Sequence, residues 1–317
     1  MESVLENLPS GSRAGILRLR SLGDCVLTTP ALEILHRARP DLRVAVMVED
    51  RFRQIFEGNP AVEAILPPEL GELRKWRPAL CLNLHGGTRS AWITALSGAR
   101  YRAGFGHFRF PAAYNVRIPR AQEILGEERT VHTVEHIASA MFYLGAPRCE
   151  IPRAKLFQKE TRPSLPAQPD AAQASRPARS SYCVIHPVAA TPRKTWRAAG
   201  FLAVADHLKA SGVESVFLGT AADDLSRFRA YRVLQGAPLS EIKSLMAGAA
   251  LFVGNDSGPA HMAAAFGLPS VVIFGASDPA VWGPWRTPAE VVTSPGGIAG
   301  VETDQVLGAL SRLKVAA

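Results

Sequence analysis

Short apolar runs alternate with helix-length segments along this chain, and this alternation constrains the fold more than any other feature. Strands are expected at GILRLR (15–20), RVAVMVE (43–49), ALCLNLH (79–85), YCVIHPV (182–188), SVFLGT (215–220), LFVGND (251–256) and SVVIFGA (270–276). Helices are expected over 24–38, 88–96, 130–144, 197–211, 239–248, 258–266 and 303–313. Strands that alternate with helices of this length build parallel sheets, so the pattern predicts an α/β protein.

The alternation is interrupted once, between residues 158 and 181, where proline, alanine and serine dominate and no apolar period survives. A chain of 317 residues also exceeds what one hydrophobic core usually supports. We therefore expect an N-terminal domain over 1–157, a linker over 158–181 and a C-terminal domain over 182–317, whose last helix could pack back on the N-terminal domain. Ligands usually bind in the cleft between two such domains.

Composition narrows the class of protein. No apolar stretch has the roughly 20 residues that a membrane-spanning helix needs, and the first residues carry acids, unlike a secretory signal. The four cysteines lie far apart, which indicates isolated reduced thiols in a cytosol, with neither disulfides nor a metal site.

Charge is distributed unevenly within the net +8. The segment 73–122 holds no Asp or Glu but nine basic residues: Arg74, Lys75, Arg77, Arg89, Arg100, Arg102, Arg109, Arg117 and Arg120. Such a segment attracts phosphate, carboxylate or an acidic membrane surface. The alternative is a solvated face balanced by acids elsewhere in the fold. Nucleic acid is disfavoured, because no aromatic stacking platform or known binding module accompanies the charge.

The turn after the strand at 251–256 is the most informative segment. Asp256, Ser257, Gly258 and Pro259 open a helix, and His261 follows near its start. A helix N-terminus offers free N–H groups and a positive dipole end, which suit a diphosphate. Alternatively Asp256 or Ser257 is a plain N-cap and His261 a packed core residue.

Two other strand-to-helix turns carry candidate groups. After the strand at 182–188, the loop with Ala189 and Ala190 leads to Lys194, which can meet a phosphate or remain a surface lysine. After the first strand come Gly23 and Asp24. The Asp24 carboxylate can take a proton from an attacking hydroxyl, or it can serve only as the N-cap of the first helix.

Several common motifs are absent. The sequence has no GxxxxGK[ST], no GxGxxG after the first strand, no HExxH, no DxD-like cluster and no GxSxG. These absences disfavour a P-loop NTPase, a nicotinamide dehydrogenase, a metal-dependent transferase and a serine hydrolase. The adjacent Asp223 and Asp224 would point apart on a helix.

Four segments, in order and spacing, resemble the ADP-heptose:lipopolysaccharide heptosyltransferase family, glycosyltransferase family 9. They are RLRSLGDCVLTTPAL (18–32), NLHGGTRSAWITALSGARYRAGF (83–105), the HP…K-W turn (186–196) and VGNDSGPAHMAAAFGLPSVVIFGASDPAVWGP (253–284). The resemblance implies a GT-B fold, in which two Rossmann-like domains face each other across a cleft. The N-terminal domain would hold the acceptor and the C-terminal domain the nucleotide-sugar.

The resemblance also implies roles for residues and a metal-independent, inverting reaction without a cofactor. Asp24 resembles the family's general base and Lys194 its donor-phosphate lysine, while Asp256, Ser257, Gly258 and His261 match the donor-binding turn. The donor site is expected to comprise Gly23, Ala189, Ala190, Lys194, Asp256, Ser257, Gly258, Pro259 and His261. An anionic glycolipid acceptor of the Kdo-lipid A type would meet Arg20, Arg89, Arg100, Arg102 and Arg109, on a cytoplasmic enzyme that contacts the inner leaflet of the inner membrane peripherally.

This chain departs from the family pattern at HPVA (186–189) and FGAS (274–277), which bear on the sugar and base of the donor. Two alternatives therefore stand beside ADP-heptose transfer. One is a GT-B transferase or epimerase that uses another nucleotide-sugar, such as a UDP-hexose. The other is a non-catalytic protein that keeps the cleft for binding.

Overall fold

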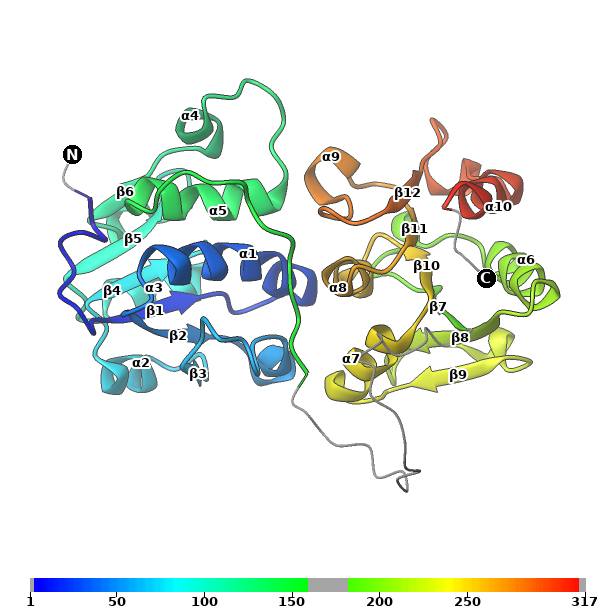
Figure 1. Ribbon diagram of the computed structural model, residues 1–317, viewed down its shortest axis with the longest axis horizontal. Helices are drawn as coiled ribbons and strands as arrows, with labels where there is room; N and C mark the ends of the chain where they lie inside the picture. Colours follow the sequence, from blue (N-terminus) through cyan, green and yellow to red (C-terminus); the bar gives the residue numbers. More distant parts are fainter. Residues whose placement is uncertain (1–2, 159–181, 314–317) are drawn as a thin grey trace, which may run out of the picture.

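A computed structural model describes residues 3–158 and 182–313, which form two α/β halves lying side by side (Figure 1). The expected linker, 158–181, lies outside these residues except for Gln158. No helix in the described ranges combines the length and the apolar character required to cross a membrane. The four cysteines are free, and burial raises the thiol pKa of Cys25 and of Cys81 to about 12.

Six parallel strands form the N-terminal sheet in the order β3-β2-β1-β4-β5-β6. They are β1 (Arg13–Leu17), β2 (Arg43–Met47), β3 (Ala64–Leu66), β4 (Leu80–Asn83), β5 (Tyr101–Phe105) and β6 (Val116–Ile118). The helices of this half are α1 (Leu22–Ala38), η1 (Asp50–Ile55), α2 (Leu70–Trp76), α3 (Thr88–Ala95), η2 (Pro111–Ala113), α4 (Ala121–Leu125) and α5 (Thr133–Leu144), of which η1 and η2 are 3₁₀ helices.

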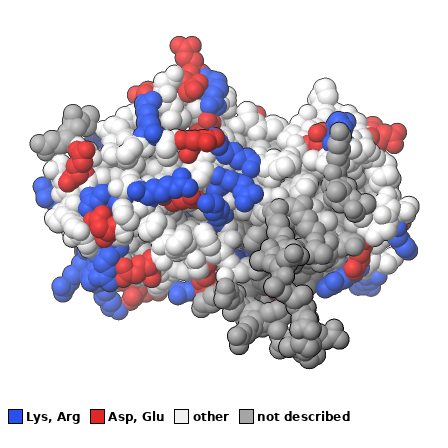
Figure 2. All heavy atoms as spheres, viewed as in Figure 1, with Lys and Arg blue, Asp and Glu red and all other residues white. Residues whose placement is uncertain are grey.

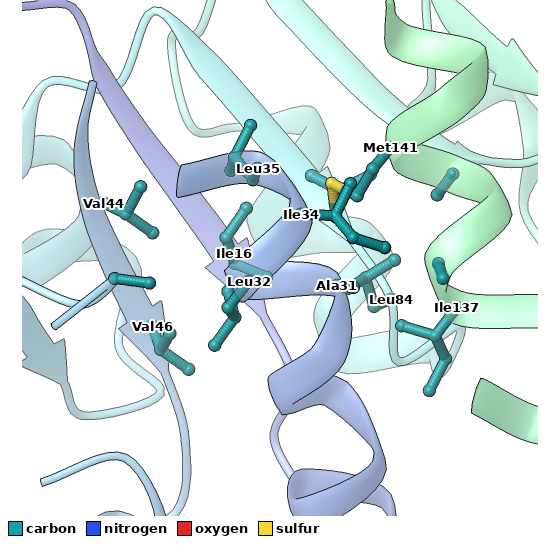
Figure 3. Packing of buried hydrophobic residues seen from close by; sticks show 14 of the residues in the cluster. Ile16, Ala31, Leu32, Ile34, Leu35, Val44, Val46, Leu84, Ile137 and Met141 are labelled. Carbon is teal, nitrogen blue, oxygen red and sulfur yellow. The ribbon is translucent and has the colours of Figure 1, made fainter. Parts of the chain in front are cut away.

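Both faces of this sheet are covered, because successive side chains of a strand point to opposite faces. Ile16 of β1 belongs to the core under α1 and α5, and its neighbour Leu17 belongs to the core under α2 and α3. In Figure 3, Leu32 and Leu35 of α1 point toward the sheet, whereas Ala31 and Ile34 point toward Ile137 and Met141 of α5. Burying each such Leu or Ile stabilises the fold by about 1.5–3 kcal/mol.

The C-terminal half repeats this architecture, with the sheet order β12-β11-β10-β7-β8-β9. Its strands are β7 (Tyr182–His186), β8 (Glu214–Gly219), β9 (Arg232–Gln235), β10 (Leu251–Asn255), β11 (Ser270–Ile273) and β12 (Ala289–Val292). Its helices are η3 (Pro192–Lys194), α6 (Ala198–Ala210), η4 (Ser226–Phe228), α7 (Leu239–Gly248), α8 (Gly258–Phe266), α9 (Pro279–Trp282), η5 (Ile298–Gly300) and α10 (Thr303–Arg312), with η3, η4 and η5 of the 3₁₀ type.

The two sheets share one strand order. Read from β7 as the first strand, the C-terminal order is third, second, first, fourth, fifth, sixth, the same as in the N-terminal half. The last helix, α10, makes its main contacts with β12, α6 and β11, so it packs within its own half rather than back on the N-terminal half.

The halves meet through α1 and α8, which lie next to each other between the two sheets (Figure 1). Several hydrogen bonds also cross the boundary, among them an Arg286–Glu150 ion pair. Nε2 of His132 lies 2.9 Å from the Gly283 carbonyl oxygen, Nε1 of Trp285 donates to Pro152 O at 3.0 Å, and Nζ of Lys243 donates to Gln54 O at 2.8 Å. The His132 and Trp285 rings stack with centroids 4.8 Å apart.

Candidate active site

The candidate residues follow the central strands of both sheets. In each sheet the first and fourth strands are neighbours, β1 with β4 and β7 with β10. The chain leaves two such strands toward opposite sides, which opens a crevice at their carboxyl ends where ligands bind in α/β proteins. Asp24 follows β1, Lys194 follows β7 and Asp256 follows β10. The sheet topology therefore carries these three side chains to the crevices.

Asp24 is held by its own helix end and by a buried arginine. Its Oδ2 accepts hydrogen bonds from the Ser21 backbone N–H (3.2 Å) and hydroxyl (2.9 Å). Its Oδ1 lies 3.4 Å from Nη1 of Arg18, whose Nε donates to Thr28 Oγ1 at 3.1 Å. Ser21, not Asp24, is the N-cap of α1, so the interpretation of Asp24 as an N-cap is wrong. The Asp24 side chain is 25% exposed, which leaves the carboxylate within reach of a substrate.

The start of α8 holds a second charged pair. Nζ of Lys194 lies 2.9 Å from Oδ2 of Asp256, and the same oxygen accepts a hydrogen bond from the Ser277 hydroxyl. Asp256 is 5% exposed and Lys194 33% exposed at the side chain, so the lysine covers the carboxylate and faces the solvent. Ser257 is the N-cap of α8, and Pro259 stands in its first turn, as expected. The hydroxyl oxygen of Ser257 lies 3.0 Å from Nδ1 of His186.

Two glycines let α1 and α8 approach each other closely. A Cβ atom added to Gly23 would lie 2.6 Å from Cδ2 of His261, and one added to Gly258 would lie 2.7 Å from Cδ2 of Leu22. Each helix thus presents a glycine to a side chain of the other. Since a real Cβ does not approach another heavy atom this closely, only glycine permits this packing. The N-termini of both helices therefore border one site.

His261 lies at the centre of this site. Burial lowers its pKa to about 4; Asp256 and Asp24 oppose that shift, while His132 and Lys194 add to it. The geometry agrees with these causes, because Gly23, next to Asp24, lies against the His261 ring, and His261 stands in α8 shortly after Asp256. His261 is neutral near pH 7.

A buried amide shapes the loop after β4. Asn83 Nδ2 donates to Ser90 Oγ (3.1 Å) and Tyr114 Oη (2.9 Å), and its Oδ1 accepts from the backbone N–H groups of His85 and Gly86. Burial lowers the pKa of His85, and the charges of Arg18 and Arg20 lower it further. These hydrogen bonds hold the loop after β4, which belongs to the family-like segment 83–105, in one conformation near Arg18.

The sequence did not identify several residues that position this site. Trp196 donates from its backbone N–H to Asn255 Oδ1 (2.9 Å) and from its indole to Val301 O (2.8 Å), which fixes the loop that carries Lys194. Ser277, which donates to the Asp256 carboxylate, was also missed. A weak signal existed for both, since Trp196 and Ser277 stand in motif segments. Arg18, by contrast, was expected near Asp24 from its place in the first strand.

The remaining expected residues fall into two groups. Ala189 and Ala190 lie in the loop after β7, before η3, and Arg20, Arg89 and Arg109 follow the carboxyl ends of β1, β4 and β5. Arg100 precedes β5 and Arg102 is its second residue, so both lie near the amino ends of the strands, at the opposite edge of the sheet. The structure does not bring Arg100 and Arg102 together with Asp24.

Two pockets adjoin the site. One, of about 550 Å³, lies in the C-terminal half and is lined by Pro192, Arg193, Gly275, Ala276 and residues 296–299. The other, of about 460 Å³, lies between the halves, because Val281 of α9 lines it together with His107, Arg120 and His136. Burial, together with the charges of His107 and Arg18, lowers the pKa of His136 to about 4.

The buried histidines predict acid instability. Burial lowers the pKa of His136, His186 and His261 to about 4 each, whereas the unfolded chain titrates them near 6.5. Below about pH 6.5 the unfolded state binds more protons, so the free energy of unfolding should fall by on the order of 1 kcal/mol per histidine and pH unit, down to about pH 4. Urea unfolding at about pH 7 and about pH 5 measures this loss.

The replacement His136→Gln should reduce the loss of stability between these two pH values, and replacing the exposed His207 in the same way should not. Equal losses in wild type and His136→Gln would show that His136 does not titrate in this range.

Comparisons with known proteins agree with this geometry. Residues 72–302 match the profile of glycosyltransferase family 9 (heptosyltransferase). Lipopolysaccharide heptosyltransferase 3 of Escherichia coli is 27% identical over 297 residues, which cover 84% of this chain and 84% of that protein. Lipopolysaccharide heptosyltransferase 1 of Escherichia coli (strain K12) is 25% identical over 323 residues, which cover 95% of this chain and all of the relative.

Solved structures share the fold. A family 9 glycosyl transferase from Veillonella parvula superposes with a TM-score of 0.80 at 21% identity, covering 97% of this chain and 98% of the other. The ADP-heptose lps heptosyltransferase II of E. coli gives 0.75 at 21% identity, with 95% and 98% covered. The predicted GT-B fold is confirmed, and the non-catalytic alternative is set aside. Because the profile matches more than half of its length, the chain belongs to glycosyltransferase family 9, and it is a glycosyltransferase.

Proposed function

We propose that this enzyme transfers a heptose from ADP-heptose to an anionic lipopolysaccharide inner-core acceptor of the Kdo-lipid A type, with inversion and without a metal ion or cofactor. One observation carries the proposal: α1, which carries Asp24, and α8, which begins next to the Lys194–Asp256 pair, interlock through Gly23 and Gly258. The names of the relatives supply the sugar and the acceptor class. The enzyme would act at the cytoplasmic face of the inner membrane.

The C-terminal half offers the elements of a donor site. Pro192 and Arg193 of η3 line the 550 Å³ pocket, and the next residue is Lys194. A nucleoside in this pocket would extend its diphosphate toward the Lys194 ammonium and the N-terminus of α8 at Ser257 and Gly258. The ammonium carries a full positive charge and the helix N-terminus a partial one, so both stabilise the negative charge that develops on the departing diphosphate.

The transfer then needs one base. The acceptor hydroxyl gives its proton to Asp24 as its oxygen attacks the anomeric carbon on the face opposite the diphosphate. The bond from the anomeric carbon to the diphosphate oxygen breaks, and its electron pair leaves with ADP. Ser21 and Arg18 keep the carboxylate in place during this step. A single displacement inverts the configuration at the anomeric carbon.

The decisive experiment combines binding and turnover. In thermal shift, ADP at about 100 times its dissociation constant should add about 2.7 kcal/mol, and UDP should add far less. ADP release should require both ADP-heptose and the core acceptor, should persist in EDTA, and should give a product whose anomeric configuration is inverted by NMR. Stabilisation by UDP alone would favour the UDP-hexose alternative, and retention of configuration would remove Asp24 as the base in a single displacement.

The pocket between the halves supports an anionic acceptor. Within the described residues Arg120 forms no ion pair, and it faces this pocket with His107 and His136, whose rings lie 5.3 Å apart. Replacement Arg120→Ala should raise the KM for acceptor at least about tenfold, since a charge-assisted hydrogen bond contributes about 1.5–3 kcal/mol. The KM for donor should stay within about twofold.

The matched control for this prediction is Arg102→Ala, because Arg102 lies near the amino ends of the same sheet. Steady-state kinetics with each substrate varied in turn separates the two KM values. An increase in both KM values, or an equal increase for Arg102→Ala, would contradict an acceptor role for Arg120.

A further inference from the structure

One helix of the N-terminal half exposes an apolar face. Within residues 3–158 and 182–313 three large hydrophobic side chains are exposed: Trp92 (62%), Leu96 (45%) and Val291 (41%). Trp92 belongs to α3, and Leu96 is the C-cap of this helix. Arg89, Trp92 and Leu96 follow one another at spacings of three and four residues, so they lie on one face of the helix.

An apolar groove continues this face. A pocket of about 220 Å³ lies between α3 and η2, and its lining consists of Ala91, Trp92, Ala95, Phe110, Ala112 and Ala113. No polar side chain contributes to it. An exposed Trp beside such a groove costs solvation free energy in water, and contiguous apolar surface of this kind usually marks an interaction site.

Three arginines surround the apolar face. Nε of Arg74 donates to Leu96 O at 2.9 Å, Arg89 precedes Trp92 by one helical turn, and the Arg109 guanidinium lies 5.5 Å from the centre of the Phe110 ring. None of the three forms an ion pair within the part of the chain that the structure describes. The acid-free segment 73–122 contributes all of them, together with the groove.

Some other arginines of the N-terminal half pair with acids, as in Arg43–Glu63 and Arg39–Asp41. On the face drawn in Figure 2, Lys and Arg lie among Asp and Glu over the N-terminal half. Within the basic segment 73–122, the alternative of a face balanced by acids holds for Lys75, which pairs with Glu72. It does not hold for Arg74, Arg89 and Arg109, which have no carboxylate partner among the described residues.

We propose that α3 and η2 form a docking surface for a lipid bilayer that contains anionic lipid, which we call the α3 surface (Arg74, Arg89, Trp92, Leu96, Arg109 and Phe110). Trp and Phe favour the interface between headgroups and acyl chains, and arginines next to them bind lipid phosphates. An exposed tryptophan next to three arginines without a carboxylate partner fits the surface of a negatively charged membrane better than the surface of an acidic or a basic protein.

The position of the surface suits the proposed reaction. The chain enters α3 from the loop after β4, at the carboxyl ends of the strands where Asp24 lies, and α3 then runs about 12 Å back along the sheet toward the amino end of β5. A membrane that contacts the whole of α3 would therefore reach, at its first turn with Arg89, the edge of the sheet where a lipid-anchored acceptor would meet the N-terminal half. This inference deepens the proposed function, but vesicle binding itself needs no turnover.

Vesicle sedimentation of the full chain tests the α3 surface. The wild-type protein should bind vesicles of phosphatidylcholine with phosphatidylglycerol and should not bind phosphatidylcholine alone. Trp92→Ser should weaken binding at least about tenfold, because the buried aromatic area is lost. The double variant Arg89→Gln/Arg109→Gln should weaken it about 25-fold, about fivefold per arginine.

Matched controls come from the C-terminal half. Val291→Ser removes the third exposed hydrophobic side chain, and Arg227→Gln/Arg229→Gln removes two exposed arginines; both variants should bind vesicles like wild type. Trp92→Ser should also keep wild-type turnover on a water-soluble acceptor fragment.

Three outcomes would overturn the inference. They are no binding of the wild type to anionic vesicles, equal losses in the control variants, or self-association through Trp92 in sedimentation velocity. If binding fails while transfer to the soluble acceptor persists, only the α3 surface is refuted. If binding behaves as expected while ADP-heptose is not used, only the proposed function is refuted.

Discussion

Asp24→Asn should lower the transfer rate at least about a hundredfold while ADP still binds with wild-type affinity. A positioned general base contributes typically 10²–10⁴-fold, and the amide cannot take the acceptor proton. The shape of the side chain is kept, so Ser21 can still donate to its oxygen. The proposed diphosphate contacts, Lys194 and the N-terminus of α8, lie in the other half and are unchanged. Turnover by ADP release and affinity by calorimetry together measure this effect.

A stability control accompanies this variant, because Arg18 is 7% exposed and loses its anionic partner. We expect a loss of about 1–3 kcal/mol in the free energy of unfolding, so rates are compared at a temperature where both proteins are folded. Asp304→Asn is the matched variant, since Asp304 is also an aspartate in the first turn of a helix, α10. Turnover above about a tenth of wild type would remove Asp24 from the role of base.

Lys194→Met should produce the second large effect, a loss of about 10²–10³-fold in turnover together with weaker ADP binding. Removing one preorganised group that stabilises developing charge typically costs this much. The ammonium is 33% exposed beside the 550 Å³ pocket, so it can move from Asp256 to a diphosphate without unfolding the loop. ADP affinity and single-turnover rates measure the two parts of the loss.

The same change leaves Asp256 buried without its cation, which should also lower stability. The double variant Lys194→Met/Asp256→Asn removes both charges and should regain most of that stability while remaining inactive. Lys209→Ala, an exposed lysine of α6, is the control. Recovery of turnover in the double variant would mean that Lys194 acts only by neutralising Asp256.

Elements with strong end signals were predictable from the sequence. The helices α7 and α8 have the predicted bounds. Pro238 precedes α7, and α8 begins with Ser257, Gly258 and Pro259 and ends at Gly267, whose φ of +70° suits glycine. The first helix was placed two residues late, because Ser21 rather than Asp24 caps it. The strand before this helix was predicted through residue 20, but β1 ends at Leu17.

The four edge strands and β5 were not predicted. β3, β6, β9 and β12 have three or four residues, and most of those side chains are only partly buried. Polar residues interrupt the apolar runs of β5, β6, β9 and β12, and an edge strand buries less surface than a central one. The central strands β1, β4, β7 and β10, which carry the candidate site, gave the clearest signal.

The charged residues of the candidate site could be predicted from the sequence, and most of the residues that hold them in position could not. Asp256 stands directly after β10, and Asp24 and Lys194 stand in the first helical turns that follow β1 and β7, where chain order alone implies a position at the carboxyl edge of a sheet. Trp196 and Ser277 act through contacts with Asn255 and Asp256, which are 59 and 21 residues away in the sequence. Such contacts arise only when neighbouring strands pair. Arg102 was misplaced for the converse reason, because composition does not tell the two edges of a sheet apart.

The use of one strand order in both halves has a consequence for how such an enzyme diversifies. The loops after β7, β10 and β11 can change their side chains to accept another nucleotide or sugar without disturbing the loops after β1, β4 and β5. The glycine contacts between α1 and α8 join the two halves at the starts of the helices that carry the candidate site. Donor and acceptor preference can thus evolve as separable traits, and exchanging one half between relatives should transfer one preference provided Gly23 and Gly258 are retained.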